Sequence, residues 1–430
     1  MHFIVVTKDY SGLGFAMRLM EEGHKVLMAY KGKPEEMSDP ETKKHYDLVG
    51  NGIVKKAPLG QVMKKRQSLK DWYWIWDGNH AVDENELLRK EKFKVFGGGK
   101  YADMMEHDRD AALKFAKKYG LESPASFPFS DTASAISFCE QNPDTAYVFK
   151  PDEGENFETW VPESEEPEDA NNELKTHLKS LSNGGSFILQ ERKDGVETNV
   201  EVWFTNGVPK FAFMGIESKK KIVGDMGEMV GCAFDFTFEI PLDSKAVKES
   251  VGKLFPAYKK MNYTGFGDAN FIAAKDGVWF FEKCERFGYN AHPNLFWNLN
   301  KKEFGETIAS LVDGTFEPDF GPGFGASVTM YTDHPKSGKA IQFPEKLMKN
   351  LYFWDVYKED DQFLTCGYDG NILIVTGFGY TIPTAWEAVM SNAAKVKFPN
   401  RGYRNDADKT NFPSSPIRRF EALEAMNYFE

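Results

Sequence analysis

The sequence predicts a mixed α/β and α+β protein of several domains, and three observations support this fold class. The chain has 430 residues, which exceeds the usual size of one hydrophobic core and predicts about two to four domains. Residues 2–30 read as a strand, a loop, a helix and a second strand, a βαβ unit that implies a parallel sheet. Residues 265–288 read as two antiparallel strands joined at Asp276-Gly277, a dipeptide that favours a tight hairpin.

Composition and charge limit the classes of function. Apolar residues make up 41% of the chain and charged residues 27%, as in folded soluble proteins, and the net charge of −12 argues against binding nucleic acid through bulk charge. No run of about 18 apolar residues is present, so no membrane span is predicted. The first residues begin a strand and lack the charged start and apolar core of a signal peptide. The 4 cysteines show no C-x-x-C spacing, which suits reduced thiols, and we expect a cytoplasmic protein.

The opening βαβ unit belongs to a first α/β domain. Its Gly12-Leu13-Gly14 turn resembles a shortened form of the glycine-rich nucleotide fingerprint, although the full G-x-G-x-x-G spacing is absent. Two interpretations stay open, namely a helix N-terminus that holds an anion on the substrate side, or plain turn chemistry. Further strands are expected around Trp72–Trp76 and Phe93–Phe96. The dense aromatic run of the first predicts a buried strand, with a base-stacking platform as the alternative.

The rest of the chain alternates between helix and strand patterns. An amphipathic helix is expected over Asp108–Gly120, and the acidic segment 153–172 is expected to be a mobile loop or a solvated linker rather than a binding tail. A lysine-rich loop punctuated by glycines is expected over residues 218–231. The remaining elements are helices at 132–141, 298–312 and 384–394, and strands at 147–150, 186–191, 198–204, 209–216, 326–331, 363–368 and 372–378.

The hairpin at 265–288 carries the residues with the clearest chemistry. Alternation along a strand places Asp268 before the turn and Glu282, Cys284 and Arg286 after it on one face. Two carboxylates suit magnesium, which commonly binds through carboxylates together with nucleotide phosphates. An arginine beside them can stabilise a developing phosphate or acyl-phosphate charge. The alternative is a cluster of surface ion pairs.

The order of these features resembles a known family. A lysine ends the apolar strand YVFK (Lys150), a second strand leads into FILQERKDGVE, and the hairpin closes the set. This order resembles the ATP-grasp fold, in which ATP lies between two α+β subdomains. The runs GASVTMYTDHPKSGKAI, GYDGNILIVTGFGYTIPTAWEAVMSNAAKV and RGYRNDA extend the resemblance, over nearly the whole chain, to the phosphoribosylamine–glycine ligases.

The resemblance implies a division into three domains. These are an N-terminal parallel-sheet α/β domain on the substrate side (1–104), an ATP-grasp domain of two α+β subdomains (105–324) and a small C-terminal β-rich domain (325–430). The subdomain with the mobile loop is expected at about residues 123–190.

The resemblance also implies a nucleotide site. Arg109 and Lys150 fall where the family contacts nucleotide phosphates, and a lysine in a buried strand would be costly without a partner. Gln190 and Glu191 match the hinge that holds the adenine edge, and Glu197 matches a glutamate of the nucleotide pocket. ATP is the expected nucleotide.

The expected metal and catalytic residues complete this site. Asp268 and Glu282 are expected to hold Mg2+, with Mn2+ as an alternative. Arg286 is expected to stabilise the transferring phosphoryl group. Lys220 and Lys221, in the basic start of a loop that folds over the substrates, are expected to orient the carboxylate.

Several departures from the family predict altered substrates. The glycine-rich loop after Lys150 is replaced by PDEGENFETWV (151–161), whose carboxylates would repel a triphosphate. Cys284 stands where the family has a metal-binding asparagine, and a thiol is a poor magnesium ligand. Either Asp268 compensates or Glu285 is recruited. The substrate loop is shortened to GDMGEMVG (224–231), and the amino-terminal loop that helps to hold phosphoribosylamine also differs.

The expected function is an ATP-dependent carboxylate–amine ligase that works through an acyl phosphate. It would join glycine or another amino acid to an amine. The amine would be the substrate of purine biosynthesis or a different amine, such as a modified nucleotide. The alternative is a nucleotide-binding or regulatory protein whose site has decayed. The expected partners are small-molecule substrates, and no association with a membrane is expected. The chain is expected to be a monomer or a homodimer. His292 is expected either to contact substrate or to cap a turn.

Overall fold

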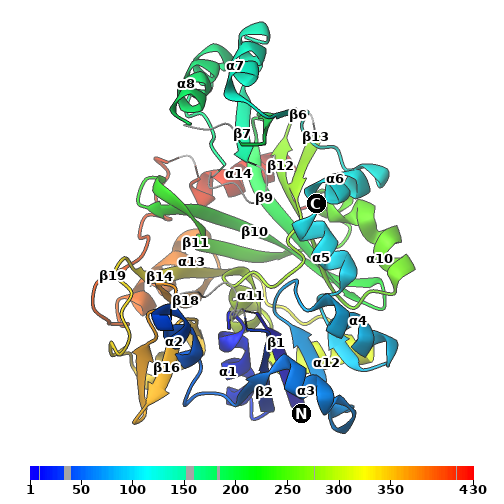
Figure 1. The fold of residues 1–430 in the computed structure, drawn as a ribbon, viewed down its shortest axis with the longest axis vertical. Coiled ribbons are helices and arrows are strands. Elements are labelled where there is room, and N and C mark those ends of the chain that lie inside the picture. Colours follow the sequence, from blue (N-terminus) through cyan, green and yellow to red (C-terminus); the bar gives the residue numbers. More distant parts are fainter. Residues whose placement is uncertain (9, 33–39, 152–158, 182–184, 276, 413) are drawn as a thin grey trace.

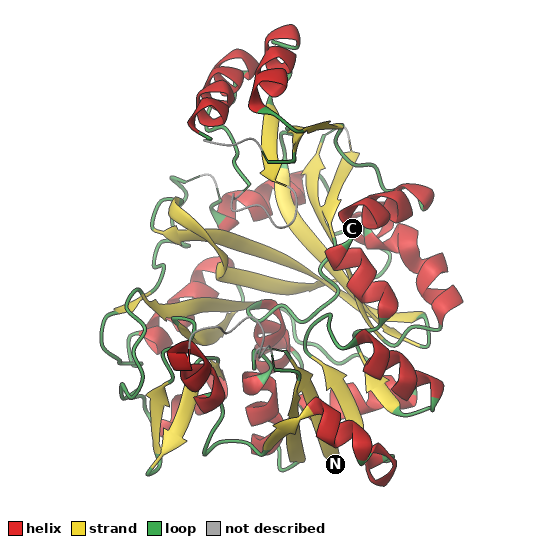
Figure 2. Ribbon diagram, viewed as in Figure 1, coloured by secondary structure: helices red, strands yellow, loops and turns green. Residues whose placement is uncertain are grey.

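The computed structural model describes residues 1–8, 10–32, 40–151, 159–181, 185–275, 277–412 and 414–430. The side chains of residues 40–42, 45, 109 and 110 are outside this description. Three sheets organise the described chain: a parallel sheet near the N-terminus, a small antiparallel sheet and a large antiparallel sheet between them (Figures 1 and 2). The expected fold class is confirmed.

The N-terminal sheet has five parallel strands in the order β3-β2-β1-β4-β5. Both of its faces are buried, because Ile4 and Trp74 project into one apolar cluster whereas Phe3 and Ile75 project into another. The prediction of a buried aromatic strand is confirmed. The elements are β1 (His2–Thr7), α1 (Leu13–Glu21), β2 (Lys25–Tyr30), α2 (Pro40–Leu48), β3 (Lys56–Pro58), α3 (Leu59–Lys64), η1 (Arg66–Leu69), β4 (Tyr73–Trp76), α4 (Val82–Lys90) and β5 (Lys94–Phe96).

The small antiparallel sheet has the order β6-β8-β7 and is covered on one face by α7 and α8, which lie at the top of Figure 1. Phe149 lies opposite Leu189 and both pack under the helices, so Lys150 and Gln190, each one residue away, lie on the face turned away from α7 and α8. The elements from the linking helices onward are α5 (Lys100–His107), α6 (Arg109–Lys118), β6 (Ser126–Phe129), α7 (Thr132–Gln141), β7 (Tyr147–Pro151), α8 (Pro167–Ser180) and β8 (Phe187–Glu191).

The large sheet has nine strands in the order β13-β12-β9-β10-β11-β14-β18-β15, with β19 pairing with β14. In this sheet β11 pairs with β14, so the pairing crosses the domain boundary predicted at 324/325. The domain boundary stays a prediction. The strands are β9 (Val196–Thr205), β10 (Val208–Ile222), β11 (Met226–Ile240), β12 (Gly265–Ala274), β13 (Gly277–Glu282), β14 (Phe324–Thr332), β15 (Leu351–Phe353), β18 (Asn371–Gly379) and β19 (Arg401–Gly402).

Short helices and a two-stranded hairpin complete the fold. They are α9 (Lys245–Glu249), η2 (Val251–Leu254), α10 (Phe255–Met261), α11 (Ala291–Asn294), η3 (Leu295–Leu299), α12 (Phe304–Asp313), η4 (Glu345–Asn350), β16 (Val356–Glu359), β17 (Gln362–Thr365), α13 (Ile382–Ala393) and α14 (Pro416–Ala425). Within the described residues, no helix is long and apolar enough to cross a membrane. The 4 cysteines are free thiols.

Three sequence expectations are corrected by the structure. The loop expected over 218–231 is instead the end of a long hairpin, because β10 continues to Ile222 and β11 begins at Met226. The acidic segment expected to be a loop to residue 172 gives way to α8, which starts at Pro167 with two acidic residues in its first turn. The helix expected from 298 begins at 304 instead, after the turn at Leu295–Leu299.

Candidate active site

Polar side chains from neighbouring strands share one face of the large sheet. Directly opposed residues of paired strands project to the same face, as do residues two apart along one strand. The opposed pairs in this row are Asp268 with Glu201, Asn270 with Glu282, and Glu217 with Asp235. A buried row of this kind is costly unless it is hydrogen-bonded or lines a ligand site.

A cavity of about 750 Å3 is lined by this row. Other parts of its lining come from Lys8 and Ser11 after β1, from residues 77–80 after β4, and from the segment 282–291. The strand order reverses between β1 and β4, and ligands of open α/β sheets bind beyond the carboxyl ends of strands at such a point. The cavity has the size of a small-molecule site.

Asp268 lines this cavity, and hydrogen bonds hold its carboxylate in place. The backbone N–H of Cys284 donates to both of its oxygens, at 2.9 and 3.0 Å, and Asn270 Nδ2 donates to one of them at 2.8 Å. Burial raises the pKa of Asp268 to about 7, although the Lys283 ammonium opposes this shift. A cation in the cavity would therefore bind the ionised form.

Glu282 shares a lysine with two other glutamates. Lys219 Nζ lies 3.5 Å from a Glu282 oxygen, 3.3 Å from Glu217 and 3.5 Å from Glu197. Burial would lower the pKa of Lys219, but the three carboxylates outweigh it and raise the pKa well above its ordinary value. The lysine is therefore a fixed positive charge beside Glu282.

Lys219, not Lys220 or Lys221, is the lysine that the structure brings to the cavity. Lys220 Nζ donates to the Gly227 carbonyl oxygen at 3.3 Å, and Lys221 pairs with Glu228 on the far strand of the hairpin. Neither lines the cavity, whereas Lys219 does. The roles expected for Lys220 and Lys221 stay predictions.

Arg286 also lies in the cavity lining. Its Nε donates to Glu106 Oε1 at 2.8 Å, and the other oxygen of Glu106 accepts from Asn79 Nδ2 at 2.8 Å. The Arg286 side chain keeps 36% of its surface exposed. The guanidinium is thus oriented by α5 and still accessible to a ligand.

Of the residues expected to hold the nucleotide, Lys150 lies beside the cavity lining. Lys150 Nζ is 5.5 Å from the Phe281 ring centroid, next to Glu282 in sequence. Gln190 Nε2 donates to Ser126 Oγ at 3.0 Å, and Glu191 pairs with Lys193 at 2.7 Å. The side chain of Arg109 and residues 152–158 of the acidic loop lie outside the described residues, as does Asp276 of the hairpin turn.

Cys284 has a poor side chain for magnesium. Its pKa is raised well above the ordinary value by burial and by Glu282, so the thiol stays protonated at neutral pH. Of the two substitutes considered, Asp268 lines the cavity, whereas Glu285 is fully buried against Lys283 Nζ at 2.7 Å and does not line it. The geometry favours Asp268.

His292 has a structural role in this site. Its Nδ1 accepts from the Gly288 backbone N–H at 2.7 Å, and its Nε2 lies 2.8 Å from Glu201 Oε1. The ring is fully buried and does not line the cavity. Of the two interpretations, capping a turn is the one that the geometry favours.

Comparisons with known proteins agree with this arrangement. No protein-family model matches the chain. A phosphoribosylamine–glycine ligase of Fusobacterium nucleatum is 22% identical over 344 residues, which cover 75% of this chain and 79% of the relative. A crystal structure of the phosphoribosylamine–glycine ligase of Thermotoga maritima matches with a TM-score of 0.67 and 19% identity, covering 94% of this chain and 100% of the other. The chain has an ATP-grasp fold and resembles phosphoribosylamine–glycine ligases.

A third match shows what an ATP-grasp neighbour binds. The biotin carboxylase domain of the Hydrogenobacter thermophilus 2-oxoglutarate carboxylase was solved with ADP, magnesium and bicarbonate, and matches with a TM-score of 0.57 and 11% identity over 99% of this chain and 98% of the other. The expected family resemblance is confirmed by these comparisons.

Sequence reasoning missed several residues of the ATP-grasp cavity. Asp77 follows the buried strand β4 directly, and a polar residue after a parallel strand is a signal that could have found it. Glu217 and Asp235 gave no local signal, because they meet only through the pairing of β10 with β11. Glu106 lies on α5, and the apolar pattern of this helix identifies only its buried residues, so it gave no signal for Glu106.

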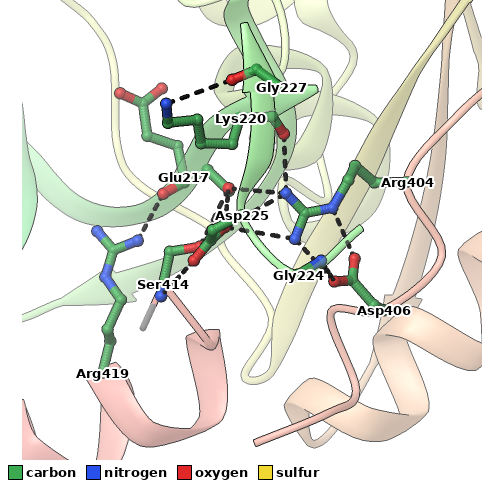
Figure 3. Close-up of polar contacts among 10 residues, drawn as sticks. Glu217, Lys220, Gly224, Asp225, Gly227, Arg404, Asp406, Ser414 and Arg419 are labelled. Atoms are coloured by element: carbon green, nitrogen blue, oxygen red, sulfur yellow. Dashed lines mark hydrogen bonds and ion pairs between the residues drawn. The ribbon is translucent and has the colours of Figure 1, made fainter. Parts of the chain in front are cut away.

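A clasp from the C-terminal part of the chain holds the β10–β11 hairpin that carries Lys219 (Figure 3). Arg404 is 1% exposed, and its Nη1 donates to the Lys220 carbonyl oxygen at 2.8 Å and to Asp225 at 3.3 Å. Asp406 accepts from the same guanidinium at 2.6 and 2.9 Å. Ser414 Oγ donates to Asp225 at 2.5 Å. This bidentate, charge-assisted set fixes the hairpin more firmly than its turn alone would.

The buried carboxyl of Asp235 makes stability depend on pH. Burial raises the pKa of Asp235 from 3.8 to about 7, Glu217 raises it further and Arg419 lowers it. The folded protein therefore holds this proton more tightly than the unfolded chain. Its stabilising contribution is complete below about pH 4 and is lost as the pH rises through about 7.

As the pH rises from about 5 to about 8, we expect the unfolding free energy of the wild type to fall by about 2–3 kcal/mol more than that of Asp235→Asn. Urea unfolding at the two pH values measures this difference. Asp194→Asn, at a side chain that is 82% exposed, serves as the control and should keep the wild-type pH dependence. Parallel pH dependences in Asp235→Asn and wild type would contradict the assignment.

Proposed function

We propose that the chain is an ATP-dependent ligase that joins a carboxylate to an amine through an acyl phosphate. The observation that carries this proposal is the convergence of Asp268, Glu282, Lys219 and Arg286 on one cavity. Two carboxylates and two cations at one place suit the transfer of a phosphoryl group with magnesium. The alternative of a decayed site is not favoured, since all four charged groups are present and oriented.

ATP would lie between the β12–β13 hairpin and the face of the small sheet that is turned away from α7 and α8. Lys150 projects from that face toward the hairpin and would contact phosphates, as would Arg109. Gln190 and Glu191 would hold the adenine edge, and Glu197 would border the pocket through its contact with Lys219. These assignments rest on the resemblance together with the shared face of Lys150 and Gln190.

Asp268 and Glu282 would hold Mg2+, with Mn2+ as an alternative. Both offer carboxylate oxygens to the cavity, the ligands that these hard cations prefer. The ion, when bound, would neutralise charge on the nucleotide phosphates.

The chemistry follows from the positions of the charges. A carboxylate oxygen of the substrate attacks the γ-phosphorus of ATP, and ADP leaves with the bridging oxygen. The amine then attacks the acyl carbon, loses a proton and expels phosphate. Arg286 would stabilise the acyl phosphate, and Lys219 would orient the carboxylate at the cavity. Positioning and charge neutralisation supply most of the rate in such transfers.

Glycine or another amino acid is the proposed carboxylate substrate, because the relatives are glycine ligases by name. Purine biosynthesis is one setting for this reaction. The expectations of a cytoplasmic location and of a monomer or homodimer stay predictions.

The test combines calorimetric titration of ATP in the presence of Mg2+ with phosphate release across amino acids and amines. We expect ATP to bind only with the metal present, and phosphate to be released only when an amino acid and an amine are both supplied. Absence of ATP binding in Mg2+, or release of phosphate that no amino acid changes, would overturn the proposal.

A further inference from the structure

We infer that the amine substrate is an unphosphorylated amine that carries a second positive charge, rather than a sugar phosphate. The inference rests on the proposed function and names the substrate class of the same cavity. It is carried by three features: the start of α1, the charges that line the cavity and an acceptor without a partner.

The start of α1 is occupied by a carboxylate of the chain itself. Gly12 precedes this helix at the carboxyl end of β1, where helix N-termini commonly bind phosphate. Here Asp77 is packed against it so closely that a Cβ on Gly12 would lie 2.7 Å from Asp77 Oδ2. Ser11 Oγ donates to the same oxygen at 3.3 Å. A phosphate at this position would meet a carboxylate, so the interpretation of the turn as an anion site is not supported.

The charges that line the cavity favour a cation. The described lining holds seven carboxyl groups, at positions 77, 106, 201, 217, 235, 268 and 282, against the ammonium or guanidinium groups of four residues, at 8, 219, 283 and 286. Three of the four cations are paired within the protein: Lys219 with Glu217, Lys283 with Glu285 and Arg286 with Glu106. Away from the proposed metal ion, which would neutralise charge beside the ATP phosphates, a phosphate dianion of the amine substrate would be repelled by this excess, whereas a cationic substrate would be attracted.

Glu217 and Asp235 form the part of the cavity best suited to an ammonium group. One oxygen of each and the Cys232 sulfur lie within 4.8 Å of one another. Because an ammonium nitrogen can donate three hydrogen bonds, it can contact both carboxylates at this spacing. Neither carboxylate is needed for the proposed metal site, which uses Asp268 and Glu282.

A buried acceptor without a partner lies elsewhere in the cavity lining. Asn79 is 7% exposed, and its Oδ1 accepts no hydrogen bond from the described residues although its Nδ2 donates to Glu106. Leaving such an acceptor unpaired costs about 1–3 kcal/mol. This oxygen is closed to solvent as the side chain stands, so a ligand N–H would pair with it once the side chain turns toward the cavity, and a phosphate oxygen would not pair with it. Trp354 and Tyr289, whose ring centroids are 4.4 Å apart, add aromatic rings to the same lining, and such rings also favour cations.

The test is calorimetric titration of the full chain, with Mg2+ and ADP present, by four probes: 1,4-diaminobutane, agmatine, butylamine and ribose 5-phosphate. We expect the two dications to bind at least about tenfold more tightly than butylamine, and ribose 5-phosphate not to bind. Tighter binding of ribose 5-phosphate than of both dications, or no binding of either dication, would overturn the inference. If ADP and Mg2+ bind normally in either case, the proposed function still stands.

Two variants locate the effect. Glu217→Gln combined with Asp235→Asn should weaken the binding of the dications at least about tenfold and leave the affinity for butylamine within about twofold of the wild-type value. Asp77→Asn should raise the affinity for ribose 5-phosphate, because it removes the carboxylate at the start of α1. Asp319→Asn, whose side chain is 49% exposed and outside the cavity lining, is the control. Equal weakening of butylamine and the dications in the double variant would contradict the assignment of the second charge.

Discussion

Replacing Glu282 by Gln is expected to lower the turnover of magnesium–ATP by about 100-fold or more while leaving the fold intact. The amide keeps the shape of the side chain but removes the charged oxygen that would hold the metal. The Glu282 side chain is 44% exposed, so little packing changes. Lys219 keeps two carboxylate partners, Glu197 and Glu217, and should stay in place.

Phosphate release at saturating substrates measures the turnover of Glu282→Gln, and urea unfolding measures its stability. Glu122→Gln is a matched control, because this exposed residue pairs through its backbone with the same strand, accepting from Phe280 N–H at 2.7 Å. The control should keep wild-type turnover. A Glu282→Gln protein that retains half of the wild-type rate would show that the metal is held elsewhere.

Replacing Lys283 by Met is expected to destabilise the protein by about 3–5 kcal/mol. Lys283 is 1% exposed, and its Nζ donates to Glu285 Oε1 at 2.7 Å and to Tyr258 OH at 3.0 Å. Burial already raises the pKa of Glu285, and Lys283 opposes that shift. Removing the lysine leaves a fully buried carboxyl without its cation, which must be protonated or remain charged at high cost.

A double-mutant cycle separates this electrostatic cost from lost packing. In Lys283→Met combined with Glu285→Gln, the carboxylate of the closest ion pair is removed and only Asp268, 3.9 Å from Lys283 Nζ in the wild type, loses the lysine, so about 2 kcal/mol or more of the stability should return. Urea unfolding of the wild type, both single variants and the double variant gives the coupling energy. Additive losses in the double variant would mean that the pair contributes only through its packing.

The sequence correctly predicted those elements whose side-chain pattern depends on the burial of the element itself. The run Tyr73–Trp76 and the strands of the 265–288 hairpin are of this kind, because periodicity along a strand depends on burial of that strand. The segment 218–231 was predicted wrongly because lysine and glycine dominate it. Its strands are held by pairing with each other and by Arg404, which lies 184 residues after Lys220 and leaves no local trace.

The same distinction applies to the site. Asp268 and Glu282 lie on the two strands of one hairpin, so alternation placed them on one face; Arg286 follows the end of β13, against the expected alternation, and the structure still puts all three at the cavity. Lys219 was indistinguishable from Lys220 and Lys221 by sequence, because the register shift between 218 and 220 decides which lysine faces inward. Only the order of the strands in the sheet could resolve this.

The clasp at Arg404 has a consequence for how the chain matures as it is made. The hairpin that carries Lys219 leaves the ribosome well before Arg404, Asp406 and Ser414 exist, and the parallel sheet of residues 2–96 is complete earlier still. Because domains generally fold in the order of synthesis, the hairpin is held in place only in the last stage. An unfinished chain therefore lacks the clasp that holds the hairpin carrying Lys219, and completion of translation is coupled to completion of this part of the cavity.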